Sequence, residues 1–246
     1  MAKSCHDLDI ICWLNNSTIP TEVASFGGRH YYVKSQAPKD AADFCYKCKY
    51  QNTCTLSSTT LYVKHDTMPF LVWDRLNLPL DKITKEQKKA FLKKDIYGKC
   101  AFKIPSDLVD RQSSIIKFKN GSTASFTLLG VATKADRFIH IIGTKGEIEG
   151  KISNNKITLR ICGSDYWVPN TQEIDLSSQI KDLAKYGGHS GGDYNIMKDV
   201  CAYLNGNKKS ISITHLKDSI NGHLCVYAIE KARKTNTIQK LGGKEK

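Results

Sequence analysis

A run of short alternating segments between Ile115 and Leu159 constrains the fold of this chain more than any other feature. Apolar and polar residues alternate through IIKFK, STASFTLL, FIHIIG, GEIEG and KITLRI, and turn residues separate these segments. A side-chain period of two is typical of strands that bury one face. The Asn120-Gly121 step favours a two-residue type I′ turn, which joins antiparallel neighbours. We therefore predict a series of antiparallel strands.

Helical patterns flank this strand region on both sides. We expect helices over residues 5–14, 193–204 and 215–231, an early strand over 22–26 and a further strand over 164–169. Asp193 is expected to cap the second of these helices. Its inward-facing residues should be Ile196, Met197, Val200, Cys201 and Leu204. The pattern predicts an α+β fold, with one large, mostly antiparallel open sheet and helices packed on one face. Residues 1–234 should form a single domain, and residues 235–246 a flexible basic tail.

Residues 34–107 interrupt this pattern with an irregular insert. Its one clear helix is expected over residues 85–94, where Thr84 and Gln87 have the spacing of a capping box. A long irregular segment inside a compact domain is usually functional, or is held by something other than an apolar core. We expect the second situation here, because the insert looks too poor in apolar residues to fold by itself.

Four cysteines could supply that support. Cys45, Cys48 and Cys54 lie within the insert in a C-x2-C-x5-C pattern, and Cys100 follows in YGKC. Four thiolates bind zinc tetrahedrally in closed structural sites. Free thiols are the alternative interpretation, and an iron–sulfur cluster is a further one.

The charge of the chain does not indicate a nucleic-acid partner. The formal net charge is +13, but only six of the 37 basic residues are arginine, and the lysines are spread along the whole chain. Nucleic-acid-binding proteins more often cluster arginine in a recognition motif. No apolar run approaches the roughly 20 residues that a bilayer requires. We expect a cytoplasmic protein with neither a nucleic-acid nor a membrane partner.

Several motifs, taken in order, resemble one family. KSCHDLDIICWL, SFGG, the cysteine cluster, DLVDRQ, KNGSTASFTL, GTKGEIEG and GGHSGGD occur in the order and spacing of a subgroup of the Gfo/Idh/MocA oxidoreductases. The resemblance covers nearly the whole chain and is to the carboxy-terminal, substrate-binding half of that family. It implies a fold related to the carboxy-terminal domains of dihydrodipicolinate reductase and glyceraldehyde-phosphate dehydrogenase. It also implies a homo-oligomer formed through the sheet.

The amino-terminal half of that family has no counterpart in this sequence. Neither GTKGEIEG nor YGGHSGGDY has the G-x-G-x-x-G spacing of a dinucleotide site. We therefore expect a Rossmann domain, joined in cis or acting in trans, to supply the NAD or NADP site. Alone, this chain should not bind the cofactor.

The resemblance assigns roles to several residues. His6 would be the catalytic base, because removing a hydroxyl proton near neutral pH suits an imidazole. Lys3 and Asp9 would contact the substrate. The alternative for His6 is a helix-capping or partly buried polar residue.

Two more residues are candidates for substrate binding. Arg111 in DLVDRQ would favour an acidic or phosphorylated substrate, although a surface salt bridge explains it equally well. His189 in the glycine-rich GGHSGGD loop could bond a sugar hydroxyl, although a tight turn is the alternative.

These observations favour the substrate-binding half of an NAD(P)-dependent oxidoreductase that acts on a sugar, inositol or related polyol. Half of an NAD-dependent glycosidase of the same family is one alternative. A non-catalytic binding or assembly domain is the other.

Overall fold

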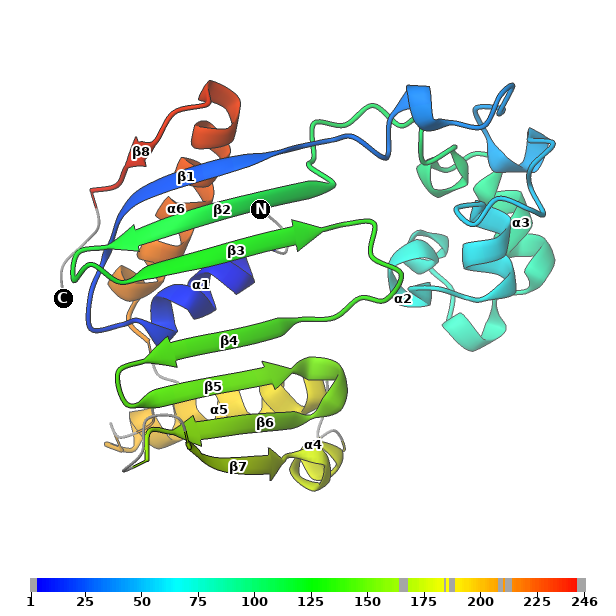
Figure 1. Cartoon of the computed structure of the whole chain (residues 1–246). Helices are drawn as coiled ribbons and strands as arrows, with labels where there is room; N and C mark the ends of the chain where they lie inside the picture. The colour runs from blue at the N-terminus through cyan, green and yellow to red at the C-terminus, as the bar shows by residue number, and fades with distance from the viewer. Residues whose placement is uncertain are drawn as a thin grey trace. The chain divides into compact units, whose positions relative to one another are not determined.

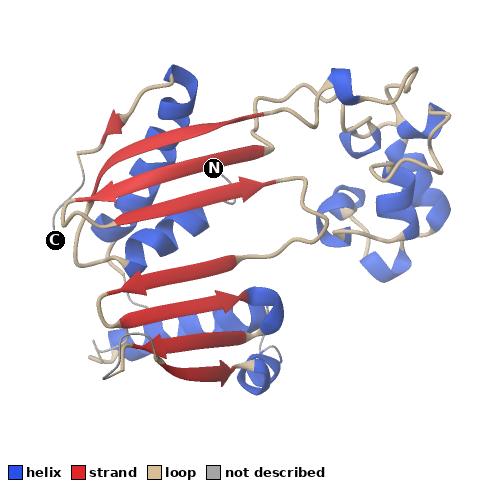
Figure 2. Cartoon of the chain, in the orientation of Figure 1, coloured by secondary structure: helices blue, strands red, loops and turns tan. Residues whose placement is uncertain are grey.

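The computed structural model describes residues 4–163, 168–183, 185, 189–207, 210 and 214–242. The chain divides into two compact units (Figure 1). Unit 1 comprises Met1–Val131 with Asn221–Glu245, and unit 2 comprises Ala132–Ile220 with Lys246. Each unit contains its own antiparallel sheet and its own helices (Figure 2).

Unit 1 is built on a four-stranded sheet in the order β3-β2-β1-β8. The strands are β1 (Pro20–Gly28), β2 (Arg111–Phe118), β3 (Thr123–Leu129) and β8 (Gln239–Lys240). Helices α1 (Ser4–Leu14) and α6 (Leu216–Thr235) lie on the same face of this sheet (Figure 1). The short β8 pairs with β1 inside the segment that we expected to be a flexible tail.

The core of unit 1 follows the predicted alternation. Successive residues of β2 are exposed and buried in turn, so Ile116 and Phe118 point to the helices while Ile115 faces outward. These two side chains pack with Val23 of β1. The rest of the cluster comes from α1 and α6: Leu8, Cys12, Cys225, Val226, Ile229 and Ala232. The predicted strands and helices of this unit are therefore confirmed.

The turn between β2 and β3 differs from the prediction. Gly121 has φ +87°, but Asn120 is not among the residues with positive φ, so the type I′ assignment is wrong. The Gly121 N–H bonds to the Phe118 carbonyl, and the Phe118 N–H bonds to the Ser122 carbonyl. The Asn120 side chain accepts from the Ser122 N–H at 3.0 Å. The hairpin is therefore one residue longer than the two-residue form, and only the glycine needs a left-handed backbone.

The insert of unit 1 has an apolar core of its own, so our expectation that it lacks one is wrong. Buried Val72, Trp73, Ile83 and Leu92 form this core, and aromatic residues such as Tyr62 and Phe91 pack around it. It contains α2 (Pro69–Val72), α3 (Lys85–Leu92), a π-helical turn (Thr59–Lys64) and 3₁₀ turns at Lys34–Gln36, Cys45–Lys47, Asp74–Leu76, Leu80–Lys82 and Ile96–Gly98. The predicted capping box of Thr84 and Gln87 is present at the start of α3.

Unit 2 is built on a sheet in the order β4-β5-β6-β7. Its strands are β4 (Phe138–Gly143), β5 (Gly146–Lys151), β6 (Lys156–Ile161) and β7 (Asn170–Asp175), and a 3₁₀ turn spans Ile152–Asn154. Most of the strand predicted over 164–169 lies outside the described residues. The helices are α4 (Ser177–Leu183) and α5 (Gly192–Leu204), with a 3₁₀ turn at His189–Gly191 before α5.

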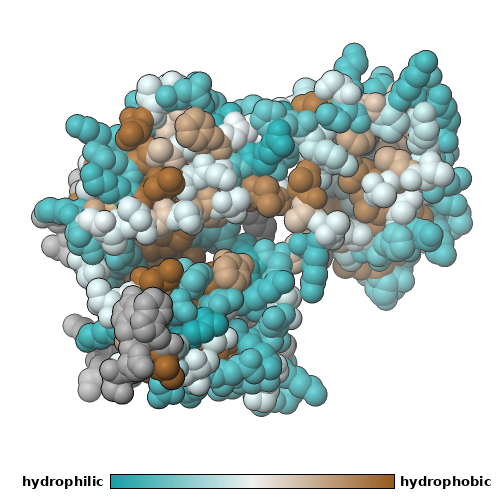
Figure 3. All heavy atoms as spheres, in the orientation of Figure 1, coloured by the Kyte–Doolittle hydropathy of each residue, from teal (hydrophilic) through white to brown (hydrophobic). Residues whose placement is uncertain are grey.

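The apolar residues of α5 are not buried as predicted. Ile196, Met197 and Leu204 are 60%, 61% and 77% exposed. Val200 is 44% exposed, and Cys201 is also exposed. Apolar side chains are scattered among hydrophilic ones on the face of the molecule that Figure 3 shows. The helical period was correct, but the described residues of this chain do not cover the apolar stripe.

The α+β class and the antiparallel pairing are confirmed. The strands of the described residues divide into two four-stranded sheets, where we had expected a single large sheet. None of the described helices combines the length and apolar character that a membrane span requires.

Candidate functional site

His6 lies on the exposed side of a helix that is anchored from the other side. Leu8 is 1% exposed and Cys12 is 8% exposed, and both pack into the unit 1 core. The Cys12 and Cys225 sulfurs lie 4.0 Å apart, which joins α1 to α6. His6 itself is exposed. The imidazole is therefore open to solvent on a backbone that packing holds in place, so a ligand can reach it.

Asp9 lies at a close approach between α1 and α6. It is half-buried, and a Cβ placed on Gly222 of α6 would come within 2.8 Å of the Asp9 Cα. Glycine at position 222 thus lets the two helices touch. Lys3, the third residue predicted for this region, lies outside the described residues.

Three buried polar residues lie on the face of the unit 1 sheet that the helices cover. Gln112 and Ser114 of β2 have the same alternation as Ile116, and both are buried. Gln112 Nε2 donates to Ser25 Oγ at 2.9 Å, and the Ser25 and Ser114 hydroxyls are also 2.9 Å apart. The face therefore changes from apolar to polar toward the start of β2. Because these buried groups satisfy one another, they fix this end of the sheet.

Asp110 anchors the loop that follows β1. Its carboxylate accepts backbone N–H bonds from His30 at 2.9 Å, Tyr31 at 2.7 Å and Tyr32 at 3.0 Å. Burial acts to raise the pKa of Asp110, but the N–H groups of Tyr32, His30 and Tyr31 outweigh it and hold the pKa below its usual value. Asp110 also acts on Tyr32, whose pKa is raised by burial, by Tyr31 and by this carboxylate. Sequence reasoning did not identify this anchoring role.

Arg111 begins β2 next to this anchor. It is exposed and pairs in register with Gly28 and Leu129. Among the described residues, no carboxylate lies within ion-pair distance of its guanidinium. A surface salt bridge, the alternative explanation for this arginine, is therefore not formed by the described part of the chain.

His189 belongs to unit 2 and is paired with an acid. Its Nδ1 lies 3.0 Å from Asp193 Oδ1, and its backbone has φ +52°. The prediction that Asp193 caps α5 is wrong, because Gly191 occupies the N-cap position with φ +83° and Asp193 lies in the first turn. The carboxylate is used to hold the imidazole. His189 is exposed, so its other ring nitrogen can reach a ligand.

Unit 2 also has a charged cluster that sequence reasoning missed. His140 Nε2 lies 2.9 Å from Glu147 Oε2, and Arg160 Nη1 lies 3.0 Å from Glu147 and 3.2 Å from Glu149. The pKa of Glu147 is lowered, first by His140 and then by Arg160. The residues lie in register on neighbouring strands, with Glu147 opposite Arg160 and His140 opposite Glu149. Each member is about a third exposed, so we interpret the cluster as a solvated ion-pair network.

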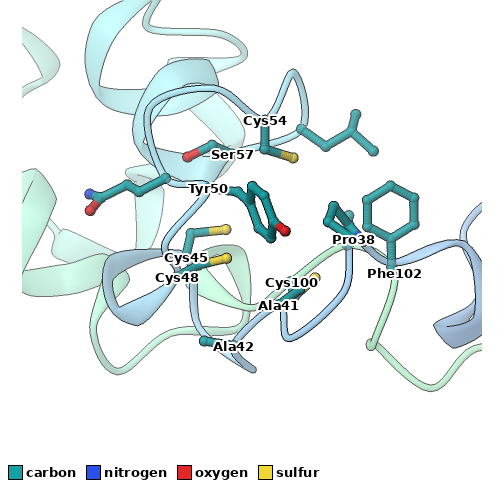
Figure 4. A pocket seen from close by; sticks show the side chains of 13 residues that line it. Pro38, Ala41, Ala42, Cys45, Cys48, Tyr50, Cys54, Ser57, Cys100 and Phe102 are labelled. Carbon is teal, nitrogen blue, oxygen red and sulfur yellow. The ribbon is translucent and has the colours of Figure 1, made fainter.

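The four predicted zinc ligands line a single pocket in the insert (Figure 4). Cys45 and Cys48 project side by side from one loop, whereas Cys54 and Cys100 stand on other parts of the wall. Cys45 and Cys100 are buried, and burial raises the pKa of the Cys100 thiol. In the described residues, no three His, Cys, Asp or Glu side chains are already arranged to hold a metal ion.

The described strands bear on whether this part of the chain contains a dinucleotide site. Every strand pair in the described residues is antiparallel. A Rossmann site places the pyrophosphate at a helix that connects parallel strands. The described strands therefore do not form a site of the Rossmann type.

Comparisons with known proteins identify relatives of the fold. No family model matches the chain. It is 21% identical over 202 residues to a protein of Bacillus subtilis (strain 168) that is named "Putative oxidoreductase YteT". That match covers 80% of this chain and 45% of YteT. The chain thus spans less than half the length of this relative.

Two solved structures share the fold. An oxidoreductase domain protein from Kribbella flavida matches with a TM-score of 0.55 and 14% identity, covering 99% of this chain and 50% of that one. The super-repressor mutant of Gal80p from Saccharomyces cerevisiae matches with a TM-score of 0.52 and 11% identity, covering 96% and 47%. The chain therefore shares its fold with these two structures. This fold occurs both in an oxidoreductase domain protein and in a repressor, so the fold alone does not decide the function.

Proposed function

We propose that this chain is the substrate-binding part of an NAD(P)-dependent oxidoreductase that acts on a sugar, inositol or related polyol. In this proposal His6 accepts the hydroxyl proton of the substrate and Asp9 binds or orients it, while Arg111 and, on unit 2, His189 are separate candidate contacts for the substrate. A Rossmann domain outside the 246 residues would hold the nicotinamide, which accepts the hydride. Residues 1–234 would form the substrate-binding and oligomerisation domain, and copies would associate through a sheet.

The observation that carries the proposal is the placement of His6. An exposed imidazole on a helix with a buried opposite face can meet a ligand without losing its position. Oxidation of a hydroxyl needs a base that is largely unprotonated near neutral pH, and imidazole meets that requirement. The name of YteT gives independent support for oxidoreductase chemistry.

The first test is to find the cofactor domain and assay the whole protein. The coding DNA upstream and in neighbouring genes is searched for a Rossmann reading frame. The assembled protein is then assayed for NADH or NADPH formation with a panel of sugars and inositols. A substrate should be oxidised, and His6→Asn should lower kcat by about 10²- to 10⁴-fold.

His65→Asn is the matched control, because His65 is also exposed but lies in the insert. It should leave kcat and KM unchanged. A His6→Asn enzyme with wild-type kcat would contradict the assignment of the base.

Net hydrolysis is the first alternative, because a base and a transient oxidation of the sugar by the nicotinamide would also serve glycoside cleavage. The same whole protein is given an aryl glycoside. Release of the aryl group without net NADH accumulation would favour the glycosidase, whereas stoichiometric NADH from a free sugar favours the dehydrogenase.

A non-catalytic binding domain is the second alternative, and the likeness to Gal80p is the observation that favours it. Such a protein would bind a sugar but show no turnover with either cofactor. His6→Asn would then weaken binding without any kinetic effect to measure.

A further inference from the structure

We propose that Cys45, Cys48, Cys54 and Cys100 bind one zinc ion, and that the ion closes the pocket they line. This inference does not rest on the proposed function. It concerns the half of the insert that carries the cysteines, and it assigns that region a metal-dependent structure.

The backbone already brings the four residues to one place. The 3₁₀ turn Cys45–Lys47 is closed by a bond from the Cys48 N–H to the Cys45 carbonyl at 3.0 Å, which sets both sulfurs on one side of the loop. The Cys100 N–H bonds to the Asp43 carbonyl at 2.8 Å, and Phe44 and Lys99 form an isolated β-bridge. Two segments that are distant in sequence are thus joined beside the thiols.

A hydrogen-bond donor reaches one of the sulfurs. The Ser58 N–H points to Cys45 Sγ at 3.4 Å. A donor of this kind stabilises a thiolate, which is the form that binds a metal.

Ser57 provides an independent observation. It is 1% exposed, it lines the same pocket, and its hydroxyl has no hydrogen-bond partner among the described residues. An unsatisfied buried hydroxyl is costly unless a partner is supplied. A thiolate of the closed metal site is an acceptor that this hydroxyl can use.

The charges around the pocket suit a thiolate site. A zinc ion with four thiolates carries net negative charge, and the pocket loops carry Lys47, Lys49 and Lys99. Lys47 and Lys49 lie over tyrosine rings, and Lys99 lies over Phe44. Lys49 is paired with Asp40 at 3.1 Å, so Lys47 and Lys99 are the cations of these loops that would offset part of that charge.

Packing explains why this half of the insert needs the metal. The buried residues near the thiols, including Ala41, Cys45, Cys100 and Phe102, belong to neither apolar cluster of the described residues. The helical half of the insert has its own core, but this half does not. Four sulfurs on a tetrahedral ion of about 2.3 Å bond length would replace that missing core.

Closure must accompany binding, because the described thiols are not yet in a coordinating arrangement. Cys54 and Cys100 stand apart from the Cys45 and Cys48 pair in Figure 4. Side-chain rotation and a small contraction of the loops would bring the sulfurs together. Zinc is favoured over magnesium or calcium, because thiolates are soft ligands.

The test measures metal in the full chain, purified without chelator and with reductant. Elemental analysis should find about one equivalent of zinc, as a single closed site requires. Cobalt added to chelator-treated protein should give the visible absorption of tetrahedral thiolate coordination. Removing the metal should lower the melting temperature of the full chain.

Variants identify the ligands. Cys48→Ser, Cys54→Ser and Cys100→Ser should each raise the zinc dissociation constant by at least about 100-fold. Cys162→Ser is the control, because Cys162 is exposed and lies in unit 2, and it should bind zinc as the unchanged chain does. If a pocket variant does not fold, the cobalt titration of the unchanged chain still decides the outcome.

Three results would overturn the proposal. The first is less than about a tenth of an equivalent of metal together with no cobalt absorption. The second is a thiol count on denatured, unreduced protein that reveals a disulfide among the four cysteines. The third is iron with acid-labile sulfide, which would assign the pocket to an iron–sulfur cluster.

Discussion

Replacing Asp110 tests whether one carboxylate organises the edge of unit 1. Asp110→Ala removes the acceptor of three backbone N–H groups, from His30, Tyr31 and Tyr32. Hydrogen bonds to a charged group contribute about 1.5–3 kcal/mol each, but two of the residues that donate are exposed, so water can replace part of the loss. At roughly 1 kcal/mol for each donor, we expect the free energy of unfolding to fall by about 3 kcal/mol.

Asp110→Asn separates charge from hydrogen bonding. One oxygen, Oδ2, accepts from all three donors, so an amide oxygen placed there keeps the bonds but loses the charge. We expect a loss of about 1–2 kcal/mol. Because the folded-state pKa of Asp110 is lowered, its contribution is present above the unfolded-state pKa of about 3.9 and is lost as the pH falls through the folded-state pKa.

Urea unfolding followed by circular dichroism measures both variants at neutral pH and under increasingly acidic conditions. The deficit of Asp110→Asn should be largest at neutral pH and should shrink as the pH falls below the unfolded-state pKa. Asp81→Asn, an exposed acid of the same unit, is the control. An Asp110→Ala protein within about 0.5 kcal/mol of the unchanged chain, or a deficit that does not depend on pH, would refute the reasoning.

Three further predictions follow from the packing of the units. Ile116→Ala should lower the free energy of unfolding in urea by about 3 kcal/mol, because the Ile116 side chain is 0% exposed. The Ile115 side chain is 58% exposed on the other face, so Ile115→Ala should lower it by less than about 1 kcal/mol. Equal losses would mean that the strand register is wrong. Gly222→Ala should lower the free energy of unfolding by about 1–3 kcal/mol, because the added methyl group would collide with Asp9. Gly242 has open space around it, so Gly242→Ala should change the free energy of unfolding little. A Gly222→Ala protein as stable as the unchanged chain would refute the close helix crossing. Asp193→Asn should change the free energy of unfolding by less than about 0.5 kcal/mol, because the ion pair of Asp193 with His189 is exposed. A larger change, seen as a shift in melting temperature, would show that the pair supports α5.

Local patterns in the sequence were sufficient for most of the secondary structure. Strand alternation from Ile115 onward and the capping box at Thr84 act over a few residues, so they can be recognised without a fold. The prediction missed that this strand begins at Arg111. The turn at Asn120 was wrong because Asn-Gly fits both a two-residue hairpin and a longer one, and tertiary pairing selects between them.

Contacts between distant residues could not be predicted. Asp110 is separated in sequence by 78 to 80 residues from the residues whose N–H groups donate hydrogen bonds to it. Gln112 is separated by 87 residues from Ser25, to which it donates a hydrogen bond. The core of the insert was missed because Trp73 and Tyr62 come from short segments with no predicted helix or strand, and only the folded chain packs them with Phe91 of α3. Only the folded chain brings such residues together.

The candidate site was predicted in part. The resemblance to a family pointed to His6, and the structure places His6 on the exposed side of α1. Cysteine spacing selected four residues that line one pocket. The pairing of His189 with Asp193 was missed, because the acid was assigned to a cap that Gly191 occupies.

Ligand titration of the purified 246-residue chain, followed by NMR of the histidine ring protons, tests the central claim most directly. The account predicts that a sugar or inositol shifts the His6 signal and leaves that of His65 unchanged, while NADH and NADPH cause no saturable change. Saturable binding of either dinucleotide at micromolar concentration, or a His6 signal that no polyol in the panel perturbs, would contradict it.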